Sequence, residues 1–454
     1  MNREEERSAP VPARDKQAEE DPWQRHGVER GVWTEPMLAA LDRGLKGNKW
    51  FSLIDKVASE RTLGLAWEKV LSNAGACGVD GITVERFGKD SQQRLLAVKE
   101  HLAKGTYQPK PVKRVWIPKP GSAERRPLGI PTVTDRVVQA ALRMVIEPIF
   151  ESRFHPQSYG FRPGRGCKDA LRRVDGLLDA GNLHVVEVDI RGYFDSIPHD
   201  RLMSLVRERI ADGRVLELLG KLLVQGVMEE GMGWQEAGEG TPQGGVISPL
   251  LANIYLDPLD WQMSGSGYEM VRYADDMVVL CRSREEAVTT LSMLREWMSE
   301  AGLELHPDKT RVVDLTEAGS HFDFLGYRFQ RSRKGGILRL VRPKSLHKLR
   351  ESIRPRTRRT EGRSMKAMVE DINRTLRGWY GYFKHAEAVV METTDGWIRG
   401  RLRSILRSRS GRRGRGRGKD HHRWPNRYFA GLGLYCLLDA RAMEIASLRT
   451  GANH

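Results

Sequence analysis

The stretch VRYADDMVVL, at residues 271–280, contains two apolar runs that are separated by two consecutive aspartates. Short apolar runs divided by a polar dipeptide are typical of a β-hairpin. We therefore expect two paired strands here, with Asp275 and Asp276 at the tip that joins them. An isolated pair of aspartates is more often an ordinary polar turn than a functional site, so its meaning depends on the segments around it.

A third acid follows another apolar run upstream. HVVEVDI, at residues 184–190, is bounded by Asn182 and Gly192 and predicts a buried strand with Asp189 near its end. Carboxylates beside apolar strands are costly unless their charge is compensated, and a divalent cation compensates it. Ligation by oxygen atoms alone selects Mg²⁺ or Mn²⁺ over zinc. Two such ions, ~4 Å apart, could activate an attacking oxygen and stabilise a leaving one in phosphoryl transfer.

A glycine-rich turn, GTPQGGVISPL at residues 240–250, precedes a predicted helix over residues 248–259. Gly244 and Gly245 permit close approach of a ligand to the backbone, and Pro242 stiffens the segment that leads to them. The N-terminal end of the following helix favours a phosphate or a base nearby. Most glycine-rich turns have no binding role. This segment is therefore a candidate ligand-binding turn only in combination with the three acids.

Composition points to a folded protein with a polyanionic partner. Hydrophobic residues make up 39% of the 454 residues, which is typical of a chain with a packed core. Lys and Arg outnumber Asp and Glu by 75 to 59, and this uneven excess favours binding to nucleic acid. The four cysteines form no C-x-x-C pair, so neither a disulfide framework nor a cysteine-rich zinc site is indicated. No apolar run is long enough to cross a bilayer, so we expect no membrane partner, and the cysteine pattern fits a reduced, cytoplasmic setting.

Together these segments resemble one protein family, the group II intron-encoded reverse transcriptases with a maturase region. YADD at residues 273–276 is similar to the Y-x-D-D box of reverse transcriptases, and VDIRGYFDSIPHDRL, which begins at Val188, resembles their first metal-binding box. GTPQGGVISPLLANIYLDPLD resembles the box between these two. Further matches run in family order from about Trp33 to Leu448: RPLGIPTVTDRVVQAAL in the fingers, GLELHPDKT and FDFLGYRF in the palm, and LRGWYGYFKHA and RWPNRYF in the maturase, or X, region. The short chain and its N-terminal extension resemble bacterial group IIC members.

The resemblance implies an α+β fold built as a right-hand polymerase. Fingers and a palm with a ferredoxin-like antiparallel sheet would be followed by a helical thumb and X maturase domain. We expect a mobile charged tail over residues 1–32, an extension and the start of the fingers over 33–106, fingers and palm over 107–330, and the thumb and maturase domain over 331–454. The boundary near residue 331 is where the composition changes.

The resemblance also implies a metal site. Its ligands would be Asp189, Asp275 and, more loosely, Asp276, with the backbone carbonyl of Ile190 assisting. The cofactor would be two Mg²⁺ ions, with Mn²⁺ as a possible substitute. Lys309, in HPDKT, matches a palm lysine that could protonate the leaving pyrophosphate. Most lone lysines serve only surface solvation, which is the alternative for Lys309.

Further positions match the family's nucleotide pocket. Phe194 falls where the family places an aromatic ring under the incoming sugar, although its apolar neighbours equally suit a core residue. Gln243 matches a glutamine that lines the pocket. Lys119 and Arg126 would hold the triphosphate, and Arg125 could replace Arg126 because the register of a loop cannot be read from sequence.

Residues 401–419, RLRSILRSRSGRRGRGRGK, are rich in arginine and glycine. They could form a solvated linker, or they could contact RNA and become ordered only on binding. For the RNA interpretation we name Arg412, Arg413, Arg415 and Arg417. Tyr380 and Tyr382 could stack on bases, whereas the helical spacing of Trp379 and Phe383 favours a place in the core.

The expected function is twofold. The protein would copy group II intron RNA into DNA from a DNA primer at a target site, using dNTPs, and would bind the intron RNA to promote its splicing. No cysteine and histidine pairs follow the maturase region, so we expect no endonuclease. Two alternatives are an RNA-binding splicing factor with an inactive polymerase site, and a reverse transcriptase that serves phage defence or DNA repair without an intron.

Overall fold

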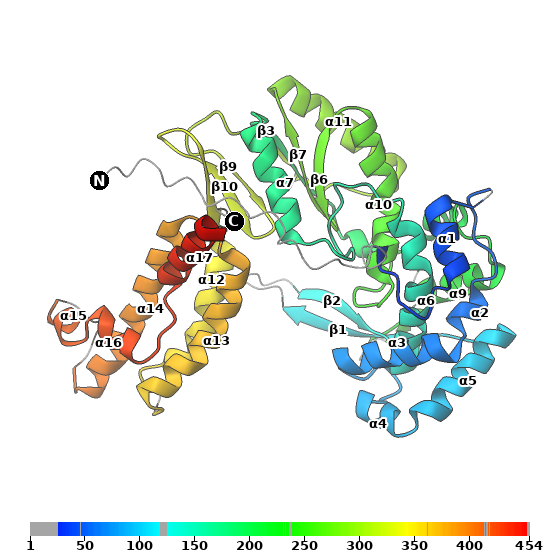
Figure 1. Cartoon of the computed structure of the whole chain (residues 1–454), viewed down its shortest axis with the longest axis horizontal. Coiled ribbons are helices and arrows are strands. Elements are labelled where there is room, and N and C mark those ends of the chain that lie inside the picture. The colour runs from blue at the N-terminus through cyan, green and yellow to red at the C-terminus, as the bar shows by residue number, and fades with distance from the viewer. Residues whose placement is uncertain are drawn as a thin grey trace. The chain divides into compact units, whose positions relative to one another are not determined.

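The computed structural model describes residues 26–45, 47–118, 125–229, 231, 233–235, 238–360, 362–412, 414, 416 and 418–451, except for the side chains of 448–451 (Figure 1). The described chain divides into two compact units between Val312 and Val313. This division lies earlier in the chain than the composition change near residue 331. Each unit is described separately below.

The first unit begins with short helices around a small finger sheet. Five helices, α1 to α5, precede the sheet: Glu35–Arg43, Ile54–Val57, Glu60–Asn73, Val84–Lys89 and Ser91–Lys104. The finger sheet has the strand order β2-β1-β4-β5, with β1(Val112–Pro118), β2(Arg125–Ile130), β4(Val227–Glu229) and β5(Gly233–Gln235). Its strands β1 and β2 are antiparallel neighbours.

A second sheet carries the acids. Its strand order is β6-β7-β3-β8, with β3(His184–Asp189), β6(Glu269–Tyr273), β7(Asp276–Cys281) and β8(Arg311–Asp314). Numbered along the chain, these are its second, third, first and fourth strands, which is the order of a ferredoxin-like β-α-β-β-α-β arrangement. Strands β6 and β7 are antiparallel, so the predicted hairpin is confirmed, but its turn is residues 274–275 and Asp276 is the first residue of β7. The strand predicted over residues 184–190 is also confirmed and ends at Asp189.

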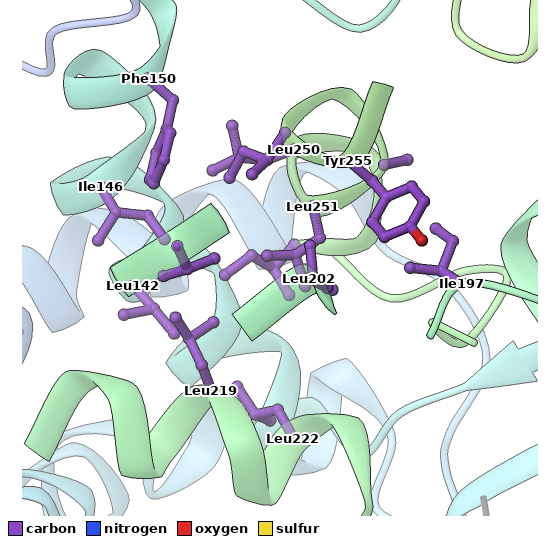
Figure 2. Close-up of a cluster of buried hydrophobic side chains, with 14 of the residues drawn as sticks. Leu142, Ile146, Phe150, Ile197, Leu202, Leu219, Leu222, Leu250, Leu251 and Tyr255 are labelled. Atoms are coloured by element: carbon purple, nitrogen blue, oxygen red, sulfur yellow. The ribbon is translucent and has the colours of Figure 1, made fainter. Parts of the chain in front are cut away.

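Helices cover this palm sheet because its central strands are apolar on both faces. The helices α7(Cys167–Asp179), α10(Ser248–Gly265) and α11(Arg284–Glu300) pack against its strands (Figure 1). A continuous core extends from α10 and α11 to α6(Val133–Glu151), α8(His199–Arg207) and α9(Gly213–Leu223). Figure 2 shows how the side chains of four helices meet there: Leu142 and Ile146 of α6, Leu202 of α8, Leu219 and Leu222 of α9, and Leu250, Leu251 and Tyr255 of α10. This core packs against the palm sheet and fixes its position.

The second unit has a three-stranded sheet and a set of helices. The sheet order is β11-β10-β9, with β9(His321–Phe324), β10(Tyr327–Arg331) and β11(Ile337–Val341). The helices are α12(Pro343–Ile353), α13(Met365–Phe383), α14(Ala388–Arg409), α15(Lys419–Arg423), α16(Asn426–Gly431) and α17(Leu437–Gly451). Met368, Ile372, Leu376 and Phe383 are buried along one face of α13, in agreement with their helical spacing.

The arginine-rich run is partly helical, so the linker interpretation is wrong for its first half. Residues 401–409 form the last turns of α14, where Leu402 and Ile405 are buried. Arg403 is also buried, and its guanidinium donates to the Trp424 carbonyl at 2.9 Å. Packing of this apolar stripe therefore overrides the composition of the segment. Arg413, Arg415 and Arg417 lie outside the described residues.

In the part of the chain that the structure describes, we find no helix with the length and apolar character needed to cross a membrane.

Candidate active site

The three sequence-predicted acids meet at one end of the palm sheet. In the strand register, Tyr273 of β6 faces Asp276 of β7, and Asp276 faces Asp189 of β3. Residues that are directly opposite in neighbouring antiparallel strands project from the same face of the sheet. Tyr273, Asp276 and Asp189 thus form a row across three strands. Asp275 lies in the turn at the end of this row.

The carboxylates of Asp275 and Asp189 are close enough to repel one another. Burial raises the pKa of Asp275 above its ordinary value, and the negative charge of Asp189 raises it further. The positive charges of Arg126 and Arg272 act in the opposite direction. Arg126, in β2, is therefore near enough to act on the acid site. This position favours Arg126 over Arg125 as the cation that faces the site.

A fully buried arginine supports the catalytic turn from below. Arg272 has no exposed surface, and its guanidinium forms a two-bond ion pair with Asp260 of α10. Its Nη1 also donates to Asn253 Oδ1 at 2.9 Å and to the carbonyl of Ala274 at 3.0 Å. Ala274, the residue between Tyr273 and Asp275, has φ +60°, a backbone conformation that is uncommon outside glycine. Arg272 thus holds the strained turn that presents Asp275.

The chain before α7 closes around the same turn. Gly160 lies so near that a Cβ atom there would be 2.2 Å from the backbone nitrogen of Ala274. Asn253 donates from Nδ2 to the carbonyl of Gly160 at 2.8 Å, which ties this segment to α10. Sequence reasoning missed Arg272, Asp260, Asn253 and Gly160. The one available signal was an arginine buried in the apolar run VRY immediately before the two aspartates.

Lys309 reaches the opposite end of the acid row. Its Nζ lies 2.9 Å from Asp189 Oδ2, and both side chains are half exposed. The loop that carries Lys309 is fixed to β3, because His306 donates its backbone N–H to the Asp189 carbonyl at 2.8 Å. Thr310 is buried beside the same residue. Lys309 is therefore an ion-pair partner of an acid-site carboxylate and not only a solvated surface lysine.

The donor set fits a divalent metal ion that is shared with a substrate. The described residues hold no group of three or more His, Cys, Asp or Glu side chains that could bind a metal by themselves. Asp189 and Asp275 supply two mutually repelling carboxylates, and the Ile190 carbonyl follows Asp189 directly. Mg²⁺ is commonly held by one or two carboxylates together with substrate phosphates and water. These two acids, with Asp276 beside them, offer that kind of incomplete, all-oxygen site.

Phe194 and Gln243 lie on neighbouring segments. Phe194 belongs to the short helix η2(Tyr193–Asp195), and its carbonyl accepts a hydrogen bond of 2.6 Å from the backbone N–H of Thr241. Its ring is partly buried, packed against the core cluster and 5.6 Å from the ring of Tyr193. Gln243 donates from Nε2 to Asp195 at 3.3 Å. The segments carrying Phe194 and Gln243 are thus joined by backbone and side-chain bonds.

The glycine-rich turn also contacts the fingers. The backbone N–H of Gly129 in β2 donates to the Gln243 carbonyl at 2.6 Å. At Gly244, which has φ +115°, a Cβ atom would lie 2.3 Å from the Gly129 carbonyl oxygen. Glycine is therefore required at 244 by close packing of two chain segments as well as by backbone conformation. Lys119, the other predicted triphosphate contact, lies outside the described residues.

The predicted RNA-binding residues are placed differently from one another. Arg412 is exposed just beyond α14. Tyr382 is 37% exposed, but Tyr380 is only 7% exposed, with its ring against Tyr435 and its hydroxyl donating to Glu444 at 3.1 Å. The expectation that Tyr380 stacks on bases is corrected by this burial, because Tyr435 packs on its ring and Glu444 of α17 binds its hydroxyl. Tyr382 stays a candidate.

Comparison with known proteins matches two parts of the chain to two protein families. Residues 117–329 match the reverse transcriptase (RNA-dependent DNA polymerase) family model, and residues 346–424 match the group II intron maturase-specific domain. Protein YkfC of Escherichia coli is 35% identical over 345 residues, which cover 67% of this chain and 88% of that protein. The group II intron-encoded protein LtrA of Lactococcus lactis is 41% identical over 198 residues, or 43% of this chain and 32% of LtrA. The chain thus spans most of YkfC but about a third of LtrA.

Among solved structures, a telomerase from Candida albicans in complex with a fragment of telomeric RNA covers 71% of this chain and 64% of its own, at 12% identity and a TM-score of 0.42. At that TM-score the likeness adds nothing to the assignment. The family assignment rests on the two family models, which match in the order polymerase then maturase, and on the similarity to YkfC and LtrA. This chain belongs to the family of group II intron-encoded reverse transcriptases with a maturase domain.

Proposed function

We propose that this reverse transcriptase extends a DNA primer on an RNA template by nucleotidyl transfer with two divalent metal ions at Asp189 and Asp275. The observation that carries the proposal is the proximity of Asp189, at the end of β3, to Asp275 in the β6–β7 turn, where burial and then the charge of Asp189 raise the pKa of Asp275. A cation bound beside two such carboxylates would favour their ionised forms. Asp276, in the same row, would assist.

Bound Mg²⁺ would neutralise the charge of the reacting phosphates and lower the pKa of the primer hydroxyl. The chain's own residues would contribute by positioning the substrates and by supplying positive charge. Lys309, 2.9 Å from Asp189, is a cation that could give a proton to the leaving pyrophosphate. Arg126, whose charge reaches Asp275, would bind the triphosphate together with Lys119. No covalent intermediate on the protein is needed, because catalysis here is positioning and electrostatics.

Selection of dNTPs would depend on Phe194. Its ring is packed against the core and its backbone is bonded to Thr241, so it cannot move away easily. A fixed ring under the sugar of the incoming nucleotide would leave no space for a 2′-hydroxyl group. Phe194→Ala should therefore admit NTPs while retaining dNTP use. Unchanged discrimination in that variant would show that Phe194 is only a core residue.

The second unit would hold the intron RNA. The match to the group II intron maturase domain supports this role, as do the exposed Arg412 and Tyr382. The relative LtrA is named as a group II intron-encoded protein, and we extend that association to this chain. The bound RNA would then serve both as the molecule whose splicing is promoted and as the template that is copied.

The test is primer extension on a primed RNA template with dNTPs, in Mg²⁺ and in excess chelator. Extension that needs the divalent ion and dNTPs, and is lost in Asp275→Ala, is the expected result. If the wild-type protein binds the RNA but does not extend the primer, it is a splicing factor with an inactive polymerase site, and the polymerase proposal is wrong.

A further inference from the structure

Phe161 is an exposed aromatic residue beside the catalytic turn, and the fold itself does not require it. Its side chain is 45% exposed, and its backbone has φ +59°. A bulky residue in this left-handed region is a conformational outlier whose backbone is strained. Glycine would adopt the same backbone without that strain. Strained residues of this kind cluster at ligand-binding and catalytic sites.

The residues on both sides of Phe161 are firmly anchored, so its outward direction is fixed. Gly160 packs against the backbone of Ala274 and accepts a hydrogen bond from Asn253. Arg162 is buried and forms an ion pair with Glu151, and its Nη1 donates to the His155 and Ser158 carbonyls at 2.6 and 2.7 Å. Between these two anchors the ring of Phe161 has no route into the core.

The ring of Phe161 extends the row of site residues. Its centroid lies 6.4 Å from that of Tyr273. Tyr273 faces Asp276, which faces Asp189, and Asp189 pairs with Lys309. The row therefore begins with two aromatic rings, continues through the acids and ends with a cation.

A duplex whose primer end lies at the acids, and which leaves them towards Tyr273, passes along this row. Neighbouring strands are about 4.8 Å apart, so Tyr273 is roughly 10 Å from Asp189 and the ring of Phe161 is farther still. The incoming nucleotide is bound at the acids and cannot reach Phe161. The last few base pairs of the primer–template duplex can, because they follow the primer end away from the acids. Two uncharged aromatic side chains, a phenyl ring and a phenol, suit the sugar and base edges of a duplex better than its phosphates.

We propose that Phe161, with Tyr273, forms a contact surface for the last few base pairs of the RNA–DNA duplex and so positions the primer end. This proposal rests on the proposed polymerase function. The contact would be independent of base sequence, since any base pair offers an apolar edge or sugar. It would favour correctly paired ends, because a mismatch shifts the sugar and base edges away from a fixed ring.

The experiment compares Phe161→Ala and Phe161→Gly with the wild-type protein. The matched control is Phe51→Ala, which removes an exposed phenylalanine (64% exposed) from the same unit away from the acids. Phe161→Ala should raise the Kd for a primed RNA template roughly tenfold, as expected when one aromatic ring no longer packs on the nucleic acid. Phe161→Gly should do the same while keeping or raising the melting temperature, because the strain is relieved. Phe51→Ala should change neither quantity.

A fluorescent base gives the location of the contact. With 2-aminopurine placed in turn at the first five primer positions from the 3′ end, the emission of the bound duplex should differ between wild type and Phe161→Ala at one or two of them. Wild-type Kd and emission in Phe161→Ala would overturn the inference, as would a melting temperature several degrees lower in Phe161→Gly. A wild-type protein that extends no primer would instead disprove the polymerase function.

Discussion

The acid end of the palm sheet and the arginine-rich end of α14 differ in what their charged groups are free to do. At the palm, Asp189 and Asp275 reach the surface, while Arg272 beneath them has every donor group committed within the protein. At α14, Arg401 and Arg403 look from the sequence like free cations. Arg401 donates to Thr357 and to two backbone carbonyls, and Arg403 donates to Trp424 and Asn426. Arg409, the last residue of the helix, is exposed and still donates to the Arg363 carbonyl, and Arg412, just beyond the helix, is exposed as well.

This contrast shows that the type of a charged residue and its availability to a ligand are separate properties. Residue type and spacing indicate where metal or RNA chemistry is possible. Whether a given side chain can take part depends on how many of its hydrogen bonds the fold has already used. By that measure Arg401 and Arg403 belong with Arg272, as internal supports, and Arg412 belongs with Asp275, as a group available to a ligand.

The largest expected effect comes from removing an available group. Asp275→Ala should lower the rate of primer extension by on the order of ten-thousandfold, which corresponds to ~5 kcal/mol of transition-state stabilisation. RNA binding measured by filter retention should change little, because the second unit is untouched. Asp179→Ala, which removes an exposed acid at the end of α7, is the matched control and should keep the wild-type rate. Normal extension by Asp275→Ala would rule out the metal assignment.

The second largest effect is expected from the loss of a buried residue that supports the catalytic turn. Asp260→Ala leaves Arg272 buried without its counter-charge, and such a change costs about 3–5 kcal/mol of unfolding free energy. Urea denaturation should show this as a lower midpoint. The double variant Arg272→Met with Asp260→Leu removes both charges and should regain most of the missing stability. It should still extend primers poorly, since nothing then holds the Ala274 carbonyl. Full activity in the stable double variant would mean that Arg272 supports the fold and not the turn.

Features that depend on local sequence could be predicted, whereas features that depend on tertiary contacts could not. The hairpin and the strand before Asp189 were predictable because two-residue alternation and apolar runs are local signals. The support by Arg272 was not, since it depends on Asp260 and Asn253, which reach it only after α10 packs on the sheet. The left-handed backbone at Phe161 is likewise fixed by tertiary contacts of its neighbours. The helix over residues 401–409 had a local signal, the pair Leu402 and Ile405, that the arginine content of the segment obscured.

A smaller effect distinguishes the two kinds of arginine. Replacement of Arg412, Arg413, Arg415 and Arg417 by glutamine should weaken binding of intron RNA. The plot of log K against log salt concentration should also become shallower, by about one unit for each phosphate that the protein no longer neutralises. Arg401→Gln should leave that slope unchanged and instead lower the unfolding free energy of the second unit by about 2 kcal/mol, because three hydrogen bonds are removed. An unchanged slope in the fourfold variant would show that residues 412–417 are only a linker.

The smallest effect concerns the stability of the acid site without metal. The folded-state pKa of Asp275 is raised above the ordinary value of about 3.9, so folding binds a proton in the interval between the two values and the ionised carboxylate destabilises the fold above it. Asp275→Asn removes that penalty. In chelator, its melting temperature should exceed that of the wild type by a few degrees at pH 7, and the difference should shrink as the pH falls through the folded-state pKa and vanish below the unfolded one. With Mg²⁺ present the order should reverse, because only the wild type gains stability from the ion. A difference that is independent of pH in chelator would mean that burial and the charge of Asp189 do not raise the pKa of Asp275, and Asp275 would then not belong to a pair of repelling carboxylates.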